Sequence, residues 1–166
     1  MRLNARGPGQ SLVEFALVVS MFTLLMLGLF DWSRTFGTYI SLTNATREAA
    51  RQTQVATRTT DPMTTVAAQP IVNQAMAAFT LPLGPGQFTA PADVCLFAAG
   101  TVLSATTTNP CDPADNGGNT PAASAAGGTG AILAVHASYT VHFLPLMSAV
   151  LPNGLTFSAA TVTVLE

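Results

Sequence analysis

The sequence predicts an α+β protein in which a long amino-terminal helix, its first half in a membrane, continues into a domain with a short second helix and a small antiparallel β-sheet. Three observations predict this fold. Residues 12–30 form an apolar segment with Glu14 as its one charge, the helical pattern continues beyond them without a proline to residue 60, and after residue 92 the apolar period changes from that of a helix to that of a strand. The residues beyond the apolar segment are enough for one domain with a single core.

The apolar segment is long enough to cross a bilayer. A transmembrane helix needs about 20 apolar residues to cross a hydrocarbon core of about 30 Å, and residues 10–31 meet this requirement. A secretory signal peptide also has a basic start and an apolar run, but this run is too long for a typical h-region and no Ala-x-Ala-like site closes it. We therefore expect residues 10–31 to be retained as a transmembrane segment.

Glu14 is the residue of this segment that needs an explanation. A charged side chain costs about 2.5–3.5 kcal/mol at the bilayer centre and less near the edge, so it usually has a function or a partner. The simpler interpretation is a charge near the end of a membrane anchor, with its carboxylate drawn to the interface.

The sharper interpretation of Glu14 uses its neighbours. The segment Gly9-Gln10-Ser11-Leu12-Val13-Glu14-Phe15 resembles the processing site of type IV prepilins, where a prepilin peptidase cuts after a glycine and the glutamate becomes the fifth residue of the mature chain. The resemblance implies a leader peptide of residues 1–9 and cleavage between Gly9 and Gln10.

The helical signal continues beyond the membrane segment. Asp61-Pro62 is the first strong stop, because the residue before a proline is pushed out of helical geometry. A helix from Ser11 to about Thr60 would be roughly 75 Å long at about 1.5 Å per residue, so half of it must project from the lipid. The outer half has a mixed, weakly apolar stripe, predicted to consist of Phe36, Tyr39 or Ile40, Thr43, Arg47, Ala50 and Gln54.

A second, shorter helix is predicted with Pro70 in its first turn, because proline is favoured there. Residues 32–79 are thus predicted to be mainly helical. The apolar side of the second helix would consist of Ile71, Val72, Ala75, Met76 and Phe79.

Residues 92–166 are predicted to be mainly β-structure. The apolar phase changes near Ala159-Ala160, which predicts a β-bulge there. Residues 107–130, rich in Thr, Asn, Pro, Ala and Gly, are expected to form a mobile surface loop. The predicted strands are residues 94–98 and 102–106, paired in a hairpin that turns at Gly100, residues 133–143, with one face in the core and the other in water, and residues 155–165.

The two cysteines, Cys95 and Cys111, are expected to form one disulfide that pins a loop, as in other exported chains. A zinc or redox site would need more ligands, and the sequence has no Cys-x-x-Cys and no histidine near these cysteines. No metal and no other cofactor is therefore expected.

Charge and cysteine content bound the location and the partners. The net charge is −2 and lysine is absent, so no basic surface exists for nucleic acid. Arginines lie on both sides of the membrane segment, and the positive-inside rule is therefore indecisive. The cysteines and the short leader favour a single-pass protein with its amino terminus in the cytoplasm and residues 32–166 as an extracytoplasmic domain.

Two further function classes have to be weighed. A hydrolase triad could in principle use a serine, His136 or His142, and a loop aspartate, namely Asp93, Asp112 or Asp115. No Gly-x-Ser-x-Gly occurs, and the two histidines would be roughly 20 Å apart on an extended strand, so surface histidines are expected instead. A membrane-anchored adhesin or ligand-binding module stays open, because the 107–130 loop is long enough to contact another molecule.

Several sequence blocks together resemble the TadE-like (TadE/TadG) proteins of the tight-adherence (Tad, or Flp) type IV pilus system. The resemblance implies a pilin-like fold and a non-enzymatic role in pilus biogenesis, as a minor pilin, a pseudopilin-like component or a membrane-held assembly factor in the bacterial cell membrane. The blocks are Gly9-Gln10-Ser11-Leu12-Val13-Glu14-Phe15-Ala16-Leu17-Val18, Gly28-Leu29-Phe30-Asp31-Trp32-Ser33-Arg34, Leu42-Thr43-Asn44-Ala45-Thr46-Arg47-Glu48-Ala49-Ala50-Arg51 and, more weakly, the tail from Leu155 to Glu166.

The resemblance to pilins implies action by helix packing in the membrane. A mature amino terminus at Gln10 would lie near Glu14 of an adjacent subunit, where the attraction of ammonium and carboxylate exceeds its value in water. Ala16 and Ser20 form a small-xxx-small pair and Gly28 follows, which would let helices approach closely, although small residues are common throughout this chain. The implied partners are the lipid bilayer, other Tad pilins and assembly-platform proteins, and prepilin peptidase.

Overall fold

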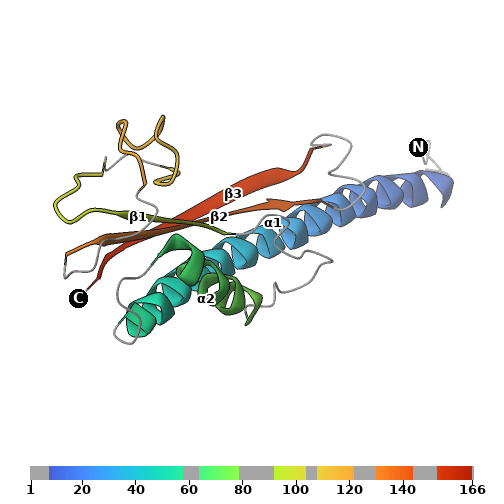
Figure 1. Ribbon diagram of the computed structural model, residues 1–166. Helices are drawn as coiled ribbons and strands as arrows, with labels where there is room; N and C mark the ends of the chain where they lie inside the picture. Colours follow the sequence, from blue (N-terminus) through green and yellow to red (C-terminus); the bar gives the residue numbers. More distant parts are fainter. Residues whose placement is uncertain are drawn as a thin grey trace, which may run out of the picture.

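The computed structural model describes residues 8–57, 64–78, 92–103, 108–121, 130–143 and 153–165. A long helix and a short helix lie on one face of a three-stranded antiparallel sheet with the strand order β1-β2-β3 (Figure 1). This arrangement confirms the predicted α+β class. The elements are α1 (Pro8–Thr57), α2 (Thr65–Ala78), β1 (Asp93–Phe97), β2 (Ile132–Val141) and β3 (Leu155–Val164).

Helix α1 is continuous over 50 residues, as the absence of proline predicted. Its two halves have different surroundings. Residues 9–30, which we call the apolar half, project beyond the sheet, and all of them are exposed except the half-buried Gly28 (Figure 1). Residues 31–57, the packed half, lie against the sheet and α2. One helix therefore serves both as an exposed apolar segment and as the support of the domain.

The packed half of α1 buries mainly alanines and threonines, and most of the predicted stripe is not buried. Of that stripe only Ala50 is buried, whereas the large side chains of Phe36, Tyr39 and Ile40 are exposed, and so is Arg47. Small side chains predominate on this face of the helix because they let the sheet approach it closely. The buried residues are Asp31, Thr35, Thr38, Leu42, Ala45, Thr46, Ala49, Ala50 and Thr53.

The buried threonines cost little because their hydroxyl groups are satisfied within the helix. Thr35 Oγ1 donates to the Asp31 carbonyl oxygen at 2.8 Å, and Thr53 Oγ1 donates to that of Ala49 at 2.9 Å. Thr46 Oγ1 donates to the carbonyl three residues before it, at 3.0 Å. A threonine bonded in this way leaves its methyl group for packing.

Strand β3 runs along the packed half of α1 in the same direction. From Tyr39 to Gln54 the helix rises about 22 Å at about 1.5 Å per residue, and from Phe157 to Thr163 the strand rises about 20 Å at about 3.3 Å per residue. The two elements therefore stay in step over their whole contact. The contacts that show this are the rings of Tyr39 and Phe157, with centroids 5.9 Å apart, the hydroxyls of Thr46 and Thr161 at 3.1 Å, and Gln54 Nε2 to Thr163 Oγ1 at 2.7 Å.

The predicted β-bulge near Ala159-Ala160 is wrong. The pairing of β2 with β3 is unbroken from Ile132↔Val164 to Val141↔Leu155. The apolar phase changes for another reason: Thr161 and Thr163 face α1 and bond to its polar side chains, whereas Val162 and Val164 face outward and are half exposed.

Strand β3 begins directly after Asn153-Gly154. Gly154 has a φ of +71°, and a Cβ atom at this position would collide with the carbonyl oxygen of Val141 on the neighbouring strand. Glycine is therefore required here by both backbone conformation and space.

The predicted first hairpin is only half right. The strand and the turn exist: β1 is followed by a turn in which Thr101 N donates to the Ala98 carbonyl at 3.2 Å, with Gly100 at a φ of +82°. The partner strand is wrong, because β1 pairs with β2, Val94 opposite Val135. Residues 101–103 are not in a strand and residues 104–106 lie outside the described residues. The chain leaves the sheet after the turn and brings Cys111 to Cys95.

Helix α2 begins before the predicted start. Thr64 caps it, with Ala67 N donating to Thr64 Oγ1 at 3.1 Å. Pro70 is inside the helix, exposed, and the carbonyl that loses its usual donor belongs to Val66, which is 81% exposed and open to water. The predicted apolar side is confirmed for the three buried residues Val72, Ala75 and Met76, Ile71 is partly buried, and Phe79 lies outside the described residues.

The close approach of the sheet to α1 predicts that Ala45, which is fully buried, cannot be enlarged. We expect Ala45→Leu to lower the free energy of unfolding by about 1–3 kcal/mol, because an overfilled core must shift its neighbours. Asn44→Leu, at the exposed position next to it, is the control and should change it much less. Urea unfolding of the detergent-solubilised protein, followed by the fluorescence of Trp32, measures both. Equal stability of the two variants would contradict the close packing.

Candidate functional site

The first candidate site is the apolar half of α1. It contains a window of mean hydropathy 2.3, none of it buried, in the one described helix that is long and apolar enough to cross a membrane. Large apolar side chains are exposed on all sides of the helix, for example Leu12, Phe15, Met21 and Leu25. A surface helix of a globular domain has one apolar stripe, whereas a helix that is apolar all round belongs in lipid or in a large core.

Gly9, Gln10 and Glu14 lie together in the first two turns of α1. All three are exposed, and a Cβ atom added to Gly9 would meet no other atom within 4 Å. Gln10 and Glu14 are one turn apart on the same side of the helix. Within the part of the chain that the structure describes, the Glu14 carboxylate has no cationic partner. A second chain could therefore supply one.

The three small residues proposed for helix packing do not lie on one line. Ala16 and Ser20 share a side of α1, whereas Gly28 lies roughly 80° around the helix from Ser20. Ser20 Oγ donates to the Leu17 carbonyl at 2.8 Å, so its hydroxyl is satisfied even in lipid. A Cβ atom at Gly28 would meet nothing within 4 Å. These positions are open to a neighbouring helix.

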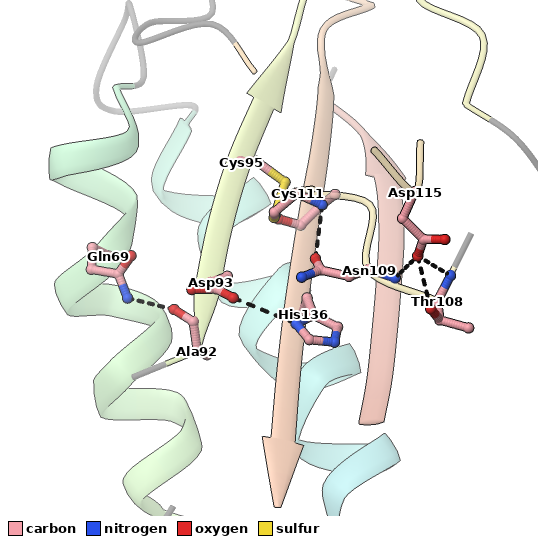
Figure 2. A network of polar contacts seen from close by, with 10 residues as sticks. Gln69, Ala92, Asp93, Cys95, Thr108, Asn109, Cys111, Asp115 and His136 are labelled. Carbon is pink, nitrogen blue, oxygen red and sulfur yellow. Dashed lines mark hydrogen bonds and ion pairs between the residues drawn. A yellow bond between two sulfur atoms is a disulfide. The ribbon is translucent and has the colours of Figure 1, made fainter. Parts of the chain in front are cut away.

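The second candidate site lies on the outer face of the sheet, opposite the helices. Cys95 of β1 and Cys111 are joined by a disulfide, with their Cα atoms 5.5 Å apart (Figure 2). This bond fixes residues 108–121, which we call the disulfide loop, to the strand. Beneath it is a small second core formed by Cys95, Phe97 and Ala134, with Leu103, Cys111 and Ile132 packed around them.

Asp115 organises the disulfide loop. Its Oδ2 accepts hydrogen bonds from the backbone N–H of Asn109 at 2.6 Å and from both the hydroxyl and the N–H of Thr108, at 2.7 and 2.8 Å (Figure 2). These hydrogen bonds stabilise the ionised carboxylate, and the bond from the backbone of Asn109 has the largest effect. They hold the pKa of the Asp115 carboxyl below its ordinary value. Asn116, fully buried, donates from Nδ2 to the Pro110 carbonyl at 2.8 Å. This part of the predicted mobile loop is therefore a folded turn structure, and residues 122–129 lie outside the described residues.

The loop also changes the surroundings of β2. The face of this strand that the alternation assigns to water is partly covered, because Ala134 is fully buried and His136, expected at the surface, is 8% exposed. His136 Nδ1 lies 3.6 Å from Asp93 Oδ2 (Figure 2). His142, at the other end of the strand, is exposed as predicted. The alternation of apolar and polar residues marked the inner face correctly but gave no sign that a distant loop covers the other one.

The residues of the hypothetical hydrolase triad are not assembled. The hydrogen bonds of Asp115 go to the turn of the disulfide loop, and Asp112 Oδ1 accepts one from Ala114 N at 2.9 Å. In the described part of the chain, no serine or threonine hydroxyl bonds to His136, and no group of three or more histidine, cysteine or acidic side chains could hold a metal ion. An open cleft of about 500 Å³ does lie between Gln69 of α2 and the disulfide loop, with Asp93, Asn109 and Asp112 on its walls.

The fold and the two sites indicate a class of protein: its described part has one helix able to cross a membrane, and a small α+β domain is packed directly on the continuation of that helix. Residues 9–51 match the model of a protein family described as TadE-like protein. The match confirms the resemblance to the TadE-like family noted from the sequence. It lies entirely within α1 and includes the apolar half and most of the packed half. No match was found among curated proteins or among solved structures.

The disulfide generates a prediction about location and stability. If the domain lies outside the cytoplasm, the unreduced, denatured protein should show no free thiol by quantitative labelling. Replacing both cysteines with alanine should lower the free energy of unfolding by about 2–4 kcal/mol, since the closed loop no longer restricts the unfolded chain. Two free thiols per chain in protein purified from its native membrane would contradict an extracytoplasmic domain.

Proposed function

We propose that this protein is a structural, non-enzymatic component of Tad pilus biogenesis, either a minor pilin or pseudopilin-like subunit or a membrane-held assembly factor. The observation that carries the proposal is the apolar half of α1, exposed on every side and with one carboxylate, inside the segment that matches the TadE-like family. Membrane insertion covers most of this surface, and contact with other membrane helices covers the rest.

Processing after Gly9 would prepare the helix for assembly. Removal of residues 1–9 leaves the amino group of Gln10 one turn from its own Glu14 and free to approach Glu14 of a neighbouring subunit. In a medium of low dielectric constant, an ammonium and a carboxylate group attract each other more strongly than in water. Their pairing also means that neither charge is left alone in lipid. Ala16, Ser20 and Gly28 would let neighbouring helices come close.

The domain would lie on the extracytoplasmic side, with residues 10–31 in the membrane and the amino terminus in the cytoplasm. The disulfide between Cys95 and Cys111 supports this orientation, because disulfides persist in oxidising compartments. The proposed partners are the lipid bilayer, prepilin peptidase, other Tad pilins and the assembly-platform proteins. Neither the helix packing nor the pairing of charges needs a cofactor.

A second function is favoured by the cleft beside the disulfide loop. A membrane-anchored adhesin or ligand-binding module would use that cleft, with Asp93, Asn109 and Asp112 as polar contacts. The two functions differ in a cheap observation. A pilus component contacts the other pilus proteins through α1, so their deletion should change its amount or location in the cell. An independent adhesin should stay in the membrane in the same amount.

The first prediction concerns cleavage. Gly9→Leu should block removal of the leader, because a bulky side chain then precedes the bond to be cut. Gly28→Leu is the matched control: it makes the same replacement on the same helix, also where a Cβ atom meets nothing within 4 Å, and should be cleaved normally. Amino-terminal sequencing of protein extracted from cells with an active prepilin peptidase decides between a chain that begins at Gln10 and a full-length chain. Full-length wild-type protein would contradict the proposal.

The second prediction concerns Glu14. Glu14→Gln should leave the protein inserted and cleaved but reduce its co-purification with other pilus components and the yield of pili, because the partner ammonium then lacks a counter-charge in lipid. Glu48→Gln is the control, since it makes the same change at a half-buried carboxylate of the packed half that pairs with Arg51. Wild-type complex formation by Glu14→Gln would reduce Glu14 to a charge at the end of a membrane anchor.

A further inference from the structure

An apolar groove lies where α1 passes from its apolar half to its packed half. Its volume is about 240 Å³. The rings of Trp32 and Phe36 meet edge to face with centroids 5.5 Å apart, and Phe157 lies against Tyr39. The hydroxyl group of Thr35 donates a hydrogen bond to the Asp31 carbonyl oxygen of its own helix. The groove, which we call the aromatic groove, is lined by Trp32, Thr35, Phe36, Tyr39, Leu155 and Phe157.

The large side chains of this groove are open to the surroundings although they belong to the domain. Trp32 is 58% exposed, Phe36 52%, Tyr39 45% and Leu155 38%. No charged residue lines the groove. An apolar patch of this kind on a small domain needs a partner that is itself apolar.

The depth of the groove relative to the membrane follows from the helix. If residues 10–31 cross the hydrocarbon core, Trp32 lies at its edge, and Phe36 and Tyr39 follow roughly 6 and 10 Å farther out. The headgroup region is about 5–8 Å thick on each side, which places Trp32 and Phe36 inside it and Tyr39 just beyond it. Tryptophan and tyrosine are the residues that membrane proteins concentrate at this level.

Strand β3 brings the sheet to the same level. Phe157 is beside Tyr39, and Leu155 lies two residues earlier on the strand, roughly 7 Å nearer the membrane. This puts Leu155 at the height of Thr35 on the helix. The edge of the β-sheet therefore reaches the headgroup region, with no linker between the domain and the membrane.

The depth of the groove favours lipid over a second helix as its occupant. If residues 10–31 cross the hydrocarbon core, Trp32, Phe36 and Leu155 lie in the headgroup region, where lipid is already present around the helix. A second subunit would have to be brought to this position by contacts of its own. Lipid is therefore the occupant that we infer.

We propose that the aromatic groove binds lipid at the membrane interface, so that the domain rests on the bilayer through Leu155 and Phe157 as well as through α1. The inference rests on the proposed membrane insertion of residues 10–31, but it adds a contact that insertion alone does not require. The bilayer surface then fixes the tilt of the domain relative to the membrane.

The test uses two reporters in the full chain, reconstituted in phosphatidylcholine vesicles. Trp32 is the only tryptophan, so its fluorescence reports on the helix. Leu155→Cys carrying an environment-sensitive fluorophore reports on the sheet edge, and Val162→Cys, half exposed and roughly 23 Å farther along β3, is the matched control. Both cysteines of the native chain are in the disulfide, so labelling without reductant is specific. The quencher is phosphatidylcholine with a nitroxide near its headgroup.

We expect the quencher to reduce the fluorescence of Trp32 and of the label at position 155 and to leave the label at position 162 unchanged. Quenching of Trp32 without quenching at position 155 would overturn the groove proposal and leave the membrane helix intact. Quenching of neither would contradict membrane insertion itself. Disulfide cross-linking of Leu155→Cys between copies in the vesicles, with no lipid quenching, would show that a second copy occupies the groove.

Discussion

The whole domain depends on the close packing of β3 along the packed half of α1. A single strand and a single helix stay parallel over about 20 Å only if the helix presents a smooth face, and here that face is made of alanines and back-bonded threonines. Sheet and helix approach closely without burying an unsatisfied hydroxyl. The polar contacts of Thr46 and Gln54 with β3 then fix which residue lies beside which.

The register set by this packing connects the two candidate sites. It fixes the height of the sheet along α1, which brings Leu155 and Phe157 to the end of the apolar half. It also directs the outer face of the sheet away from the helix, where the disulfide loop can cover it. The aromatic groove and the disulfide loop are therefore at defined distances from each other on one rigid support.

The sequence allowed the main elements to be predicted, because each had a strong local signal. The uninterrupted run before Asp61-Pro62 predicted α1, and the alternation from Leu133 onward predicted β2. Most of the errors share a cause, since contacts between residues far apart in the chain overrode the local pattern, whereas the start of α2 was set locally by the Thr64 cap. Val162 and Val164 looked like core residues and are not, because Thr161 and Thr163 face the helix instead.

The candidate sites were predictable to different degrees. The Gly9–Glu14 spacing is visible in the chain itself, and the cysteine pair was expected because an exported chain with two cysteines usually joins them. The burial of His136 and the aromatic groove could not be predicted, since each needs residues from two or more segments brought together by the fold. Trp32 and Phe36 gave a partial signal as aromatic residues directly after an apolar run, but their partners on β3 are far away in the sequence.

The shared direction of α1 and β3 also restricts how copies of this protein can meet. Among the described strands β3 is an outer one, and outer strands of separate molecules usually join in antiparallel fashion across a two-fold axis. Antiparallel pairing of two β3 strands would make the two α1 helices point in opposite directions, because each helix runs parallel to its own β3. Two copies inserted in the same bilayer with the same orientation cannot do this. The polarity of one helix thus disfavours antiparallel pairing of β3 between copies that share a membrane.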